Sequence, residues 1–355
     1  MLSRRDVLGI AAGAALMGPG LLSVQEARAA TRINGFTIQG AIYDLWLPNR
    51  DLVGTPTTNE YAITGGTKQK FTGALMYTSP QGAAILRGRV RTTFGDGGGV
   101  AVLGIPIGVE ARRATYATYT QRCTAGRVWW SSADGGKAVP ASKTVRLRGA
   151  RNFRDAAGNG SGLAVAGGRL RRGLVYRSNK LAALSGMDCA ILLDLGVTRV
   201  IDLRQPATIA ASPDRAIAGI ARTTIDVFGS TTSSDTYEMY RMFASSAYRR
   251  GKIAEAIRTI TAATGPVVLH CTYGKDRTGW IVAMIQLALG ATESAVIAEW
   301  LKSNTYLGTN TLTTGHFAAG LSEAKRLFGS VEGYLSQGLG LSATVRDQLR
   351  VRLVR

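Results

Sequence analysis

Histidine and cysteine are scarce in this chain, and their scarcity limits the kinds of site that it can form. Its 355 residues include only two histidines, His270 and His316, and three cysteines. Zinc sites draw most of their ligands from clusters of these residues, so a histidine-rich metal centre is excluded and no metal or other cofactor is expected. Three cysteines allow at most one disulfide, and a chain of this size does not need one. A bridge between Cys123 and Cys189 would join two different predicted domains, and it stays an open alternative to two buried free thiols.

Acidic residues are also few in comparison with basic ones. Lys and Arg number 43 against 23 Asp and Glu, which gives a net charge of +20. Such a charge favours anionic partners, including phosphorylated substrates and anionic lipid surfaces. No basic block with interleaved aromatic residues is present, so a nucleic-acid partner is not expected. A hydrophobic content of 45% and a charged content of 19% are typical of a globular protein, and the length suits two domains.

Residues 1–29 have the features of a twin-arginine signal peptide. Arg4 and Arg5 precede an apolar run from Val7 to Leu22, and Ala27-Arg28-Ala29 fits a small-residue cleavage site. A membrane anchor that stays attached is the alternative, but glycine and proline interrupt the apolar run. We therefore expect these residues to be removed and the remainder to be exported by the twin-arginine route, to the periplasm or the extracellular space.

Residues 30–146 show short apolar segments separated by glycine-rich turns, and no helix-length amphipathic run or internal repeat is evident. This spacing predicts a small all-β domain that resembles an immunoglobulin or fibronectin sandwich. The glycine tracts are read as hairpin turns, because no helix is expected after them. The predicted strands are Ile33 to Ile38, Ala41 to Leu47, Phe71 to Tyr77, Ala84 to Thr93, Val100 to Ile105, Ala114 to Tyr119, Arg127 to Trp130 and Lys143 to Leu147.

Residues 147–355 follow a different pattern, in which strands and helices alternate. Buried strands are expected at Leu174 to Tyr176, Thr198 to Leu203 and Pro266 to Leu269. Isoleucines at 253, 257 and 260 have helical spacing, and Ser185 is a plausible cap for a helix over Met187 to Leu195. The pattern predicts an α/β domain with a largely parallel central sheet flanked by helices. Further helices are expected at Trp280 to Leu289, Glu293 to Lys302, Phe317 to Phe328, Val331 to Ser336 and Ala343 to Leu353.

The stretch from His270 to Gly279, HCTYGKDRTG, lies between a predicted buried strand and a long apolar segment. A helix N-terminus and a tight loop of successive amides can together bind phosphate. We expect Cys271 to ionise readily in such a loop, since the same groups stabilise a thiolate. Arg277, six positions later, can clamp phosphoryl oxygens in a bidentate manner. A buried cysteine beside a structural arginine is the alternative, and the complete set of residues at these spacings argues against it.

Such a loop suits the cleavage of a phosphoester in two steps. The Cys271 thiolate attacks phosphorus and forms a thiophosphate intermediate, an acid protonates the leaving oxygen, and water then releases phosphate. Loop amides and Arg277 stabilise the charge that spreads over the equatorial oxygens. No metal is required for this chemistry.

These residues resemble the cysteine-dependent protein tyrosine phosphatases, and more closely the bacterial tyrosine/serine phosphatase group whose loop reads HCxxGKDRTG. The resemblance extends from about Leu147 to the C-terminus and leaves the predicted β domain outside. One departure is Gln205 and Thr208, where the group usually has Ser and Glu after Asp-Leu-Arg. Further segments that look like the group's motifs are Arg151 to Asp155, Val175 to Ser178, Val200 to Arg204, Lys302 to Asn304 and Gly329 to Leu335.

The resemblance implies a role for each loop position. Cys271 matches the nucleophile, Arg277 the phosphate clamp and Thr278 the hydroxyl that bonds the cysteine sulfur. His270 matches a residue that tunes the thiolate, with plain strand packing as its alternative. The remaining expected substrate-binding positions are Thr272, Tyr273, Gly274, Lys275 and Gly279. Lys275 adds a second cation that would favour substrates with more than one phosphate, such as phosphoinositides, unless it is simply solvated.

Two aspartates compete for the role of general acid. Asp276 lies inside the loop beside Arg277, whereas Asp202 ends the Asp-Leu-Arg strand and is also expected to face the site. Proximity favours Asp276, and Asp202 could instead orient loop amides or pair with Arg204.

The resulting hypothesis is an exported cysteine-dependent phosphatase that hydrolyses phosphotyrosine, with phosphoserine, phosphothreonine and phosphoinositides as further candidate substrates. One alternative is a rhodanese-like sulfurtransferase, which also uses a cysteine between strand and helix. Another is a surface protein that binds phosphorylated ligands without cleaving them, although a pure binder has no need of a nucleophile.

Overall fold

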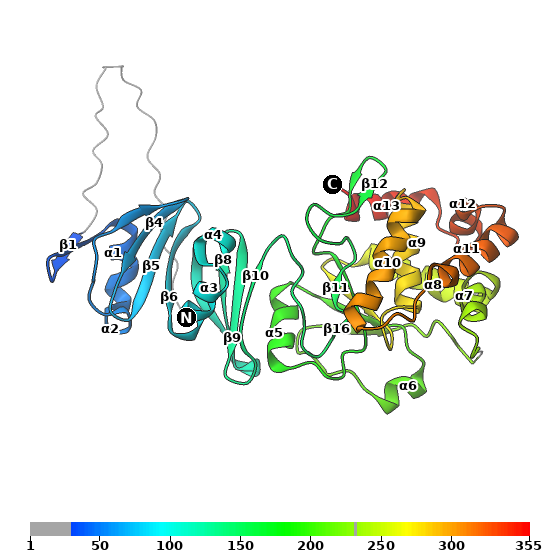
Figure 1. Ribbon diagram of the computed structural model, residues 1–355, viewed down its shortest axis with the longest axis horizontal. Helices are drawn as coiled ribbons and strands as arrows, with labels where there is room; N and C mark the ends of the chain where they lie inside the picture. The colour runs from blue at the N-terminus through cyan, green and yellow to red at the C-terminus, as the bar shows by residue number, and fades with distance from the viewer. Residues whose placement is uncertain (1–29, 231–232) are drawn as a thin grey trace, which may run out of the picture.

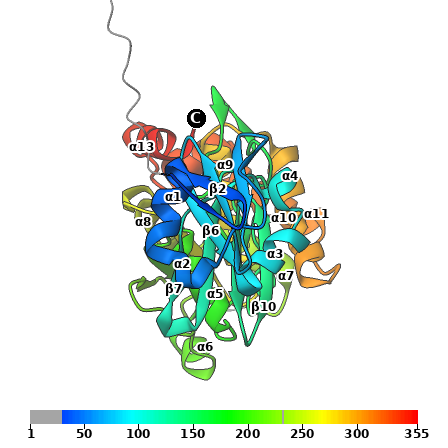
Figure 2. The same cartoon turned by 90° about the vertical axis from the view of Figure 1, so that its left-hand side faces the viewer.

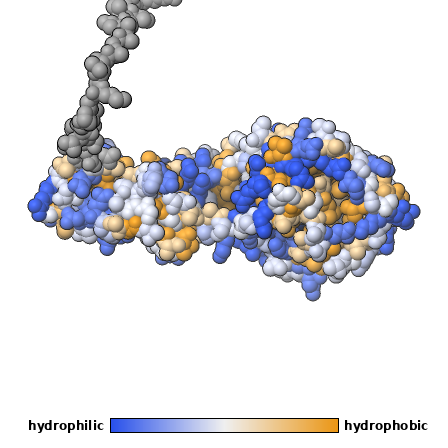
Figure 3. Space-filling model, turned by 90° about the horizontal axis from the view of Figure 1, so that it is seen from above, coloured by the Kyte–Doolittle hydropathy of each residue, from blue (hydrophilic) through white to orange (hydrophobic). Residues whose placement is uncertain are grey.

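The computed structural model describes residues 30–230 and 233–355. The chain forms two parts along its long axis (Figure 1): small antiparallel sheets with short helices, and a five-stranded sheet between helices. Seen from above, hydrophilic and hydrophobic residues are mixed over both parts (Figure 3). The expected signal peptide, residues 1–29, lies outside the described residues. Within the described ranges, no helix combines the length and the apolar character that crossing a membrane requires.

The N-terminal part consists of a short hairpin followed by two four-stranded antiparallel meanders, each entered through short helices. The hairpin pairs β1 (Ala30–Ile33) with β2 (Phe36–Gln39). The first meander comprises α1 (Gly40–Trp46), α2 (Arg50–Val53), β3 (Tyr61–Ile63), β4 (Gly66–Lys70), β5 (Ala74–Ser79) and β6 (Gly82–Arg87). The second comprises α3 (Gly88–Asp96), α4 (Gly99–Leu103), β7 (Pro106–Arg113), β8 (Thr118–Cys123), β9 (Gly126–Ser131) and β10 (Gly135–Pro140).

The two meanders are copies of one structural unit. In each, a glycine with positive φ follows the second helix: Gly54 at 80° and Gly104 at 72°. A threonine hydroxyl, of Thr72 or Thr124, accepts a hydrogen bond from the amide of the residue after that glycine, at 3.2 and 3.0 Å. A Cβ atom on either glycine would lie 2.0 Å from that hydroxyl, so both positions require glycine. The chain therefore contains an internal repeat that inspection of the sequence misses.

Helices stand where three of the strands were predicted. The underlying residues have helical rather than alternating spacing, because Ile42 and Trp46 in α1, and Val90 and Phe94 in α3, are buried at i and i+4. Short length and neighbouring glycines conceal this periodicity. The prediction was therefore wrong at residues 41–47 and 100–105, and in the second half of 84–93, where the chain forms α1, α4 and α3. It was also wrong at residues 143–147, which form neither strand nor helix.

The N-terminal cores lie between helices and sheets rather than between two facing sheets. Strand β5 separates two of these cores, since Met76 points into the cluster that contains α1 and Tyr77 into the cluster that contains α3. Viewed along the long axis, α1 and α2 lie on one side of the strands and α3 and α4 on the other (Figure 2). The expected immunoglobulin-like sandwich is thus replaced by strand meanders covered by helices.

The C-terminal part is built on a sheet with the strand order β11-β14-β17-β15-β16. Four of these strands are parallel, and β11 pairs with β14 in the antiparallel direction. Its strands are β11 (Arg154–Asp155), β14 (Val175–Ser178), β15 (Arg199–Asp202), β16 (Ala221–Thr224) and β17 (Val267–His270), and a small hairpin pairs β12 (Ala164–Val165) with β13 (Gly168–Arg169). The helices are α5 (Gly186–Asp194), α6 (Pro206–Ala211), α7 (Thr236–Ser245), α8 (Ala247–Ala262), α9 (Arg277–Ala288), α10 (Glu293–Leu307), α11 (Thr314–Phe328), α12 (Val331–Gly333) and α13 (Ala343–Leu353).

Each face of this sheet buries its own hydrophobic core. Val267 and Leu269 point into the larger core, which residues of α8, α9, α10 and α11 complete. Val268, between them, points into the other core, which is formed with α5. Trp129 of the second repeat belongs to this second core and is 2% exposed. The second repeat therefore covers part of the five-stranded sheet.

Several local predictions in this part are confirmed. Ser185 caps α5 through a capping box with Asp188, and α13 spans the residues expected. All three cysteines are free, so the bridge between Cys123 and Cys189 does not form. The boundary after residue 146 stays a prediction.

Asp194, the last residue of α5, holds the second repeat in place. Its carboxylate accepts hydrogen bonds from Trp129 Nε1 at 2.8 Å and from Arg113 Nη2 at 2.7 Å. The Asp194 side chain is 4% exposed and that of Arg113 is 43% exposed. This nearly buried carboxylate thus accepts hydrogen bonds from one neutral and one charged side chain of the N-terminal part.

We expect Asp194→Ala to lower the free energy of unfolding by about 2 to 3 kcal/mol, because the indole N–H loses its partner in a buried setting. The pair of Arg50 and Asp51, in which the Asp51 side chain is fully exposed, provides a control, and Asp51→Ala should lower stability far less than Asp194→Ala. Urea unfolding followed by tryptophan fluorescence measures both. Equal effects of the two substitutions would contradict this account of the junction.

Candidate active site

The stretch from Cys271 to Asp276 connects β17 to α9, as the sequence predicted. The neighbouring parallel strands β14 and β15 end at Ser178 and Asp202, directly beside His270 in the register of the sheet. Ligand sites in open α/β sheets lie at this carboxyl edge. The loop is therefore placed where the sheet and the first turn of α9 can act on one ligand.

The carbonyl oxygens of four consecutive loop residues accept hydrogen bonds from groups outside the loop. Because N–H and C=O point in opposite directions from a planar peptide, fixing these oxygens outward turns the amides toward the loop interior. Among the described residues, no protein acceptor pairs with the backbone N–H of Tyr273, Lys275 or Asp276. The oxygens of Thr272, Tyr273, Gly274 and Lys275 accept from Lys180 N at 3.1 Å, Asn152 Nδ2 at 2.8 Å, Arg177 Nη2 at 2.8 Å and Trp300 Nε1 at 3.2 Å, respectively.

The Cys271 sulfur lies at the bottom of this loop and is 1% exposed. The backbone N–H of Gly274 donates a hydrogen bond to it at 3.2 Å. Gly274 has a φ of +69°, and a Cβ atom there would lie 2.1 Å from the carbonyl oxygen of Ser178. Only glycine can hold this conformation so close to β14.

Arg277 opens α9 with its guanidinium group above the ring of Phe228, 4.2 Å from the ring centre. Nη2 donates to Thr272 Oγ1 at 3.2 Å and Nη1 to the Leu203 carbonyl at 3.4 Å. Among the described residues, no carboxylate forms an ion pair with it. Its Nε and the Thr278 hydroxyl are buried without a partner. Unpaired donors at one place are typical of a site that is completed by a ligand.

Asp276 differs in its surroundings from the other candidate acid. Tyr240 of α7 donates its hydroxyl to Asp276 Oδ1 at 2.9 Å. Burial raises the pKa of Asp276, and the nearby Lys275, Tyr240 and Arg277 only partly offset this effect. The carboxyl group is therefore suited to holding a proton. Aromatic rings pack around Tyr240 and fix it, namely those of Phe243, Trp280, Trp300 and His316.

Asp202 lies in a buried ionic network beside His270. It accepts from Arg204 Nε at 2.9 Å and from Arg204 Nη2 at 2.8 Å, and it also contacts Arg222. Asp214 joins the network, with Arg204 Nη2 at 2.9 Å and His270 Nε2 at 2.9 Å. Burial alone would raise the pKa of Asp202 and Asp214, but hydrogen bonds and charges from Arg204 and His270 bring both below the usual value. Both side chains are suited to remaining ionised.

The same network contains the one group of residues in the described ranges that has the spacing of a metal site. One ligand atom each from Asp202, Asp214 and His270 lies within 4.8 Å of the others. However, Arg204 and Arg222 already pair with both carboxylates, so a cation would have to displace two guanidinium groups. The donor set fits an ionic network better than a metal ion.

The remaining predicted positions line the loop or support it. Tyr273 is 60% exposed at the mouth, and Lys275 Nζ donates to Thr311 Oγ1 at 3.2 Å. Gly279 lies in the first turn of α9, where a Cβ atom would meet Trp300 at 2.6 Å, so its position serves packing. His270 is fixed between Asp214 and the Cys271 carbonyl, which Nδ1 approaches to 3.2 Å.

Sequence reasoning assigned no role to several residues that shape the site. Asn152 and Arg177 stood inside recognised motifs, so a signal was present without an interpretation. Asp214, Tyr240 and Trp300 stand outside any recognised motif, and only the folded chain brings them to the loop.

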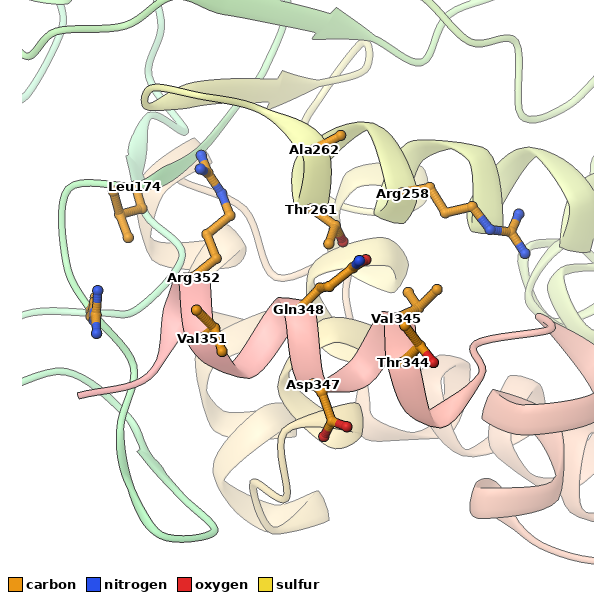
Figure 4. A pocket seen from close by; sticks show the side chains of 11 residues that line it. Leu174, Arg258, Thr261, Ala262, Thr344, Val345, Asp347, Gln348, Val351 and Arg352 are labelled. Atoms are coloured by element: carbon orange, nitrogen blue, oxygen red, sulfur yellow. The ribbon is translucent and has the colours of Figure 1, made fainter.

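One surface hollow lies away from this loop. It measures about 920 Å³ and lies between α8 and α13, where the side chains of Thr261 and Gln348 face one another (Figure 4). Leu174, just before β14, also lines it, which places it at the opposite edge of the sheet from Cys271. No residue of the loop contributes to its walls.

Two family models match this chain. The model described as "Tyrosine phosphatase family" matches residues 145–355, which is more than half of the chain. The model described as "LGFP repeat" matches residues 53–101, from α2 into α4. The second meander, which copies the first, continues beyond this match.

Similar proteins point to the same family. "Triple specificity protein phosphatase PtpB" of Mycobacterium tuberculosis is 29% identical over 199 residues, covering 44% of this chain and 68% of that protein. "Tyrosine-protein phosphatase" of Nostoc commune is 27% identical over 220 residues, covering 50% and 73%. Among solved structures, P. aeruginosa TpbA covers 50% of this chain and 95% of its own, at 20% identity and a TM-score of 0.32. That structural likeness is too weak to support any further statement.

We expect Gly274→Ala to weaken the binding of an oxyanion such as tungstate by about 100-fold, because the loop must move away from Ser178 and its amides lose their alignment. Gly158 provides a matched control, since it also has a positive φ, of +80°, but open space around its Cβ position. Gly158→Ala should cost about 1 kcal/mol in stability and leave tungstate binding unchanged. Calorimetric titration measures the binding. Similar affinities in all three proteins would show that the position of this glycine does not matter.

Proposed function

The chain belongs to the tyrosine phosphatase family, and on this basis we propose that it hydrolyses phosphotyrosine through a thiophosphate on Cys271. The observation that carries this proposal is the loop, in which outward-held carbonyls turn the amides toward the sulfur of Cys271. In the described ranges, Arg277 also has no carboxylate partner. A dianionic phosphoryl group suits these unpaired donors.

In the first step the Cys271 thiolate attacks phosphorus, so that a P–S bond forms as the bond to the leaving oxygen breaks. Asp276, whose pKa burial raises, gives its proton to that oxygen. Loop amides and Arg277 bind the three equatorial oxygens, on which charge accumulates in a loose transition state. Tyr240 keeps the Asp276 carboxyl group in place.

In the second step water attacks phosphorus and the P–S bond breaks. The Asp276 carboxylate now takes a proton from the water, phosphate leaves, and Cys271 returns to the thiolate form. The buried hydroxyl of Thr278, which has no partner of its own, is available to the departing sulfur. The protonation state of each group is thereby restored.

The contrast between the two aspartates favours Asp276 as the acid. Asp202 pairs with two arginines and its pKa lies below the usual value, so it would rarely hold a proton to give. Its position supports His270 and β15 instead, which we assign as its role.

Substrates beyond phosphotyrosine are a further part of the proposal. The half-exposed Lys275 and the exposed Tyr273 form an open, cationic mouth that suits phosphoserine, phosphothreonine and phosphoinositides as well. The relative from M. tuberculosis is named for triple specificity. The net charge of +20 also supports association with anionic surfaces.

Export is proposed from the sequence alone, through the twin-arginine motif in residues 1–29, to the periplasm or the extracellular space. A sulfurtransferase activity and a purely binding role have no specific observation in their favour. Arg277, which forms no ion pair with a carboxylate of the described residues and whose Nε is free, lies beside Cys271 and suits turnover of a phosphoester better than either.

We expect Cys271→Ser to abolish the release of phosphate from phosphotyrosine, phosphoserine and a phosphoinositide, with a loss of at least about 10⁴-fold, because the reaction loses its nucleophile. Phosphate release by the full chain and by the variant measures this effect. Undiminished release by the variant would exclude the proposal, and tight binding of phosphopeptide by the unsubstituted protein without turnover would favour the binding role.

A second test separates Asp276 from Asp202. Asp276→Asn should slow phenyl phosphate by about 10² to 10³-fold and 4-nitrophenyl phosphate far less, because a better leaving group needs no proton. Since the pKa of Asp276 is raised, the unsubstituted enzyme should lose kcat as pH rises and the acid ionises, and Asp276→Asn should remove this alkaline decline. Asp202→Asn is the matched control and should slow both substrates equally. The reverse pattern would make Asp202 the acid.

A further inference from the structure

A second buried network, formed by Arg154, Arg177, Glu299 and Ser303, lies behind the loop on the side away from Asp202. Arg154 pairs with Glu299 at 2.7 Å and reaches Ser303 Oγ at 3.1 Å. Arg177 reaches the same hydroxyl at 3.3 Å and the carbonyl oxygen of Gly274 at 2.8 Å. The four residues are between 0 and 3% exposed. The network therefore joins β11, β14 and α10 to the backbone of the loop.

The charges in this network do not balance. Two guanidinium groups face one carboxylate, and Glu299 is also within 3.1 Å of the half-exposed Lys302. In the described part of the chain, no carboxylate lies within ion-pair distance of Arg177, and its Nε is buried without a partner. Burial, followed by repulsion from Arg154, lowers the pKa of Arg177 to about 9, so the group stays charged at neutral pH. A buried positive charge is thus left without a counter-charge.

The network on the other side of the loop behaves differently. There, the carboxylates of Asp202 and Asp214 are matched by the guanidinium groups of Arg204 and Arg222. Of these two networks, only the one that contains Arg177, directly behind Gly274, has an excess of positive charge. Burial of an unpaired charge is costly, and buried charges in proteins are usually paired.

We propose that Arg177 is a positioning residue that also balances charge: it fixes the Gly274 carbonyl, and its own charge is compensated by the anion in the loop. That anion is the Cys271 thiolate in the resting protein and the phosphoryl group during the reaction. This inference rests on the proposed function for its kinetic part, whereas the stabilisation of the thiolate can be measured without any substrate. Arg177 does not touch the substrate, because the Gly274 peptide stands between them.

The test compares Arg177→Met with Arg177→Lys in the full chain. Alkylation of Cys271 by iodoacetamide, followed by mass spectrometry of the modified peptide, reports the thiolate fraction as a function of pH. We expect Arg177→Met to raise the midpoint of alkylation by about one pH unit or more, because the thiolate loses its counter-charge. Arg177→Lys should lie between Arg177→Met and the unsubstituted protein, since part of the charge is restored. Arg258, which donates to the Gly340 carbonyl near the distant hollow, is the control, and Arg258→Met should leave the midpoint unchanged.

Several outcomes would overturn the inference. If Arg177→Met folds and keeps the original alkylation midpoint, the charge-balancing role is excluded. The role is also excluded if Arg177→Lys and Arg177→Met have the same alkylation midpoint. The positioning role predicts a fall in kcat of at least about 10-fold in Arg177→Lys, and an unchanged kcat excludes it. If Arg177→Met does not fold, the alkylation midpoint of Arg177→Lys alone tests the charge-balancing role. An unchanged midpoint in Arg177→Lys would then contradict that role. If the alkylation midpoint depends on Arg177 but the unsubstituted protein has no phosphatase activity, only the proposed function is contradicted.

Discussion

The hydrogen bonds that hold the loop carbonyls outward are the constraint on which the rest of the site depends. Without them, the peptide groups between Thr272 and Lys275 would be free to rotate, and no set of amides would face the Cys271 sulfur. The donors come from segments that are far apart in the sequence, including Asn152, Arg177 and Trp300. Catalytic geometry is thus a property of the whole C-terminal part. The burial of its sheet between two cores keeps these segments in register, and preorganised amides cost no reorganisation when charge develops.

Residues of the same type in the site differ in their electrostatics because they have different neighbours. Asp276 and Asp202 are both aspartates near the same loop, yet one faces a tyrosine hydroxyl and aromatic rings while the other faces two arginines. Their pKa values move in opposite directions for this reason. The arginines differ in a similar manner, since Arg204 has two carboxylate partners and Arg277 has none among the residues that the structure describes. Neighbours, more than residue type, assign the roles.

Much of the catalytic part could be predicted because its signals are local. The strand, loop and helix around Cys271, the Ser185 cap and the extent of α13 follow from apolar runs and capping residues within a few positions. The role of Tyr240 could not be predicted, because contact with Asp276 requires α7 to fold back over the loop. The helices of the repeats were missed for another reason: with two buried residues each, α1 and α3 are too short to show a period. The repeat itself is visible only through paired details such as Gly54 with Thr72 and Gly104 with Thr124.

The placement of Trp129 has a consequence for how the chain is divided. The match to the phosphatase family begins at residue 145, whereas Trp129 lies before it, in β9 of the second meander. By packing, Trp129 is a core residue of the sheet that carries the active loop, and Asp194 is the partner that holds it there. The family match and the hydrophobic core of the sheet therefore have different borders. A fragment that begins at residue 145 would leave part of an apolar face of its own sheet exposed to water. The second repeat covers this face in the full chain and so completes the core of the enzyme.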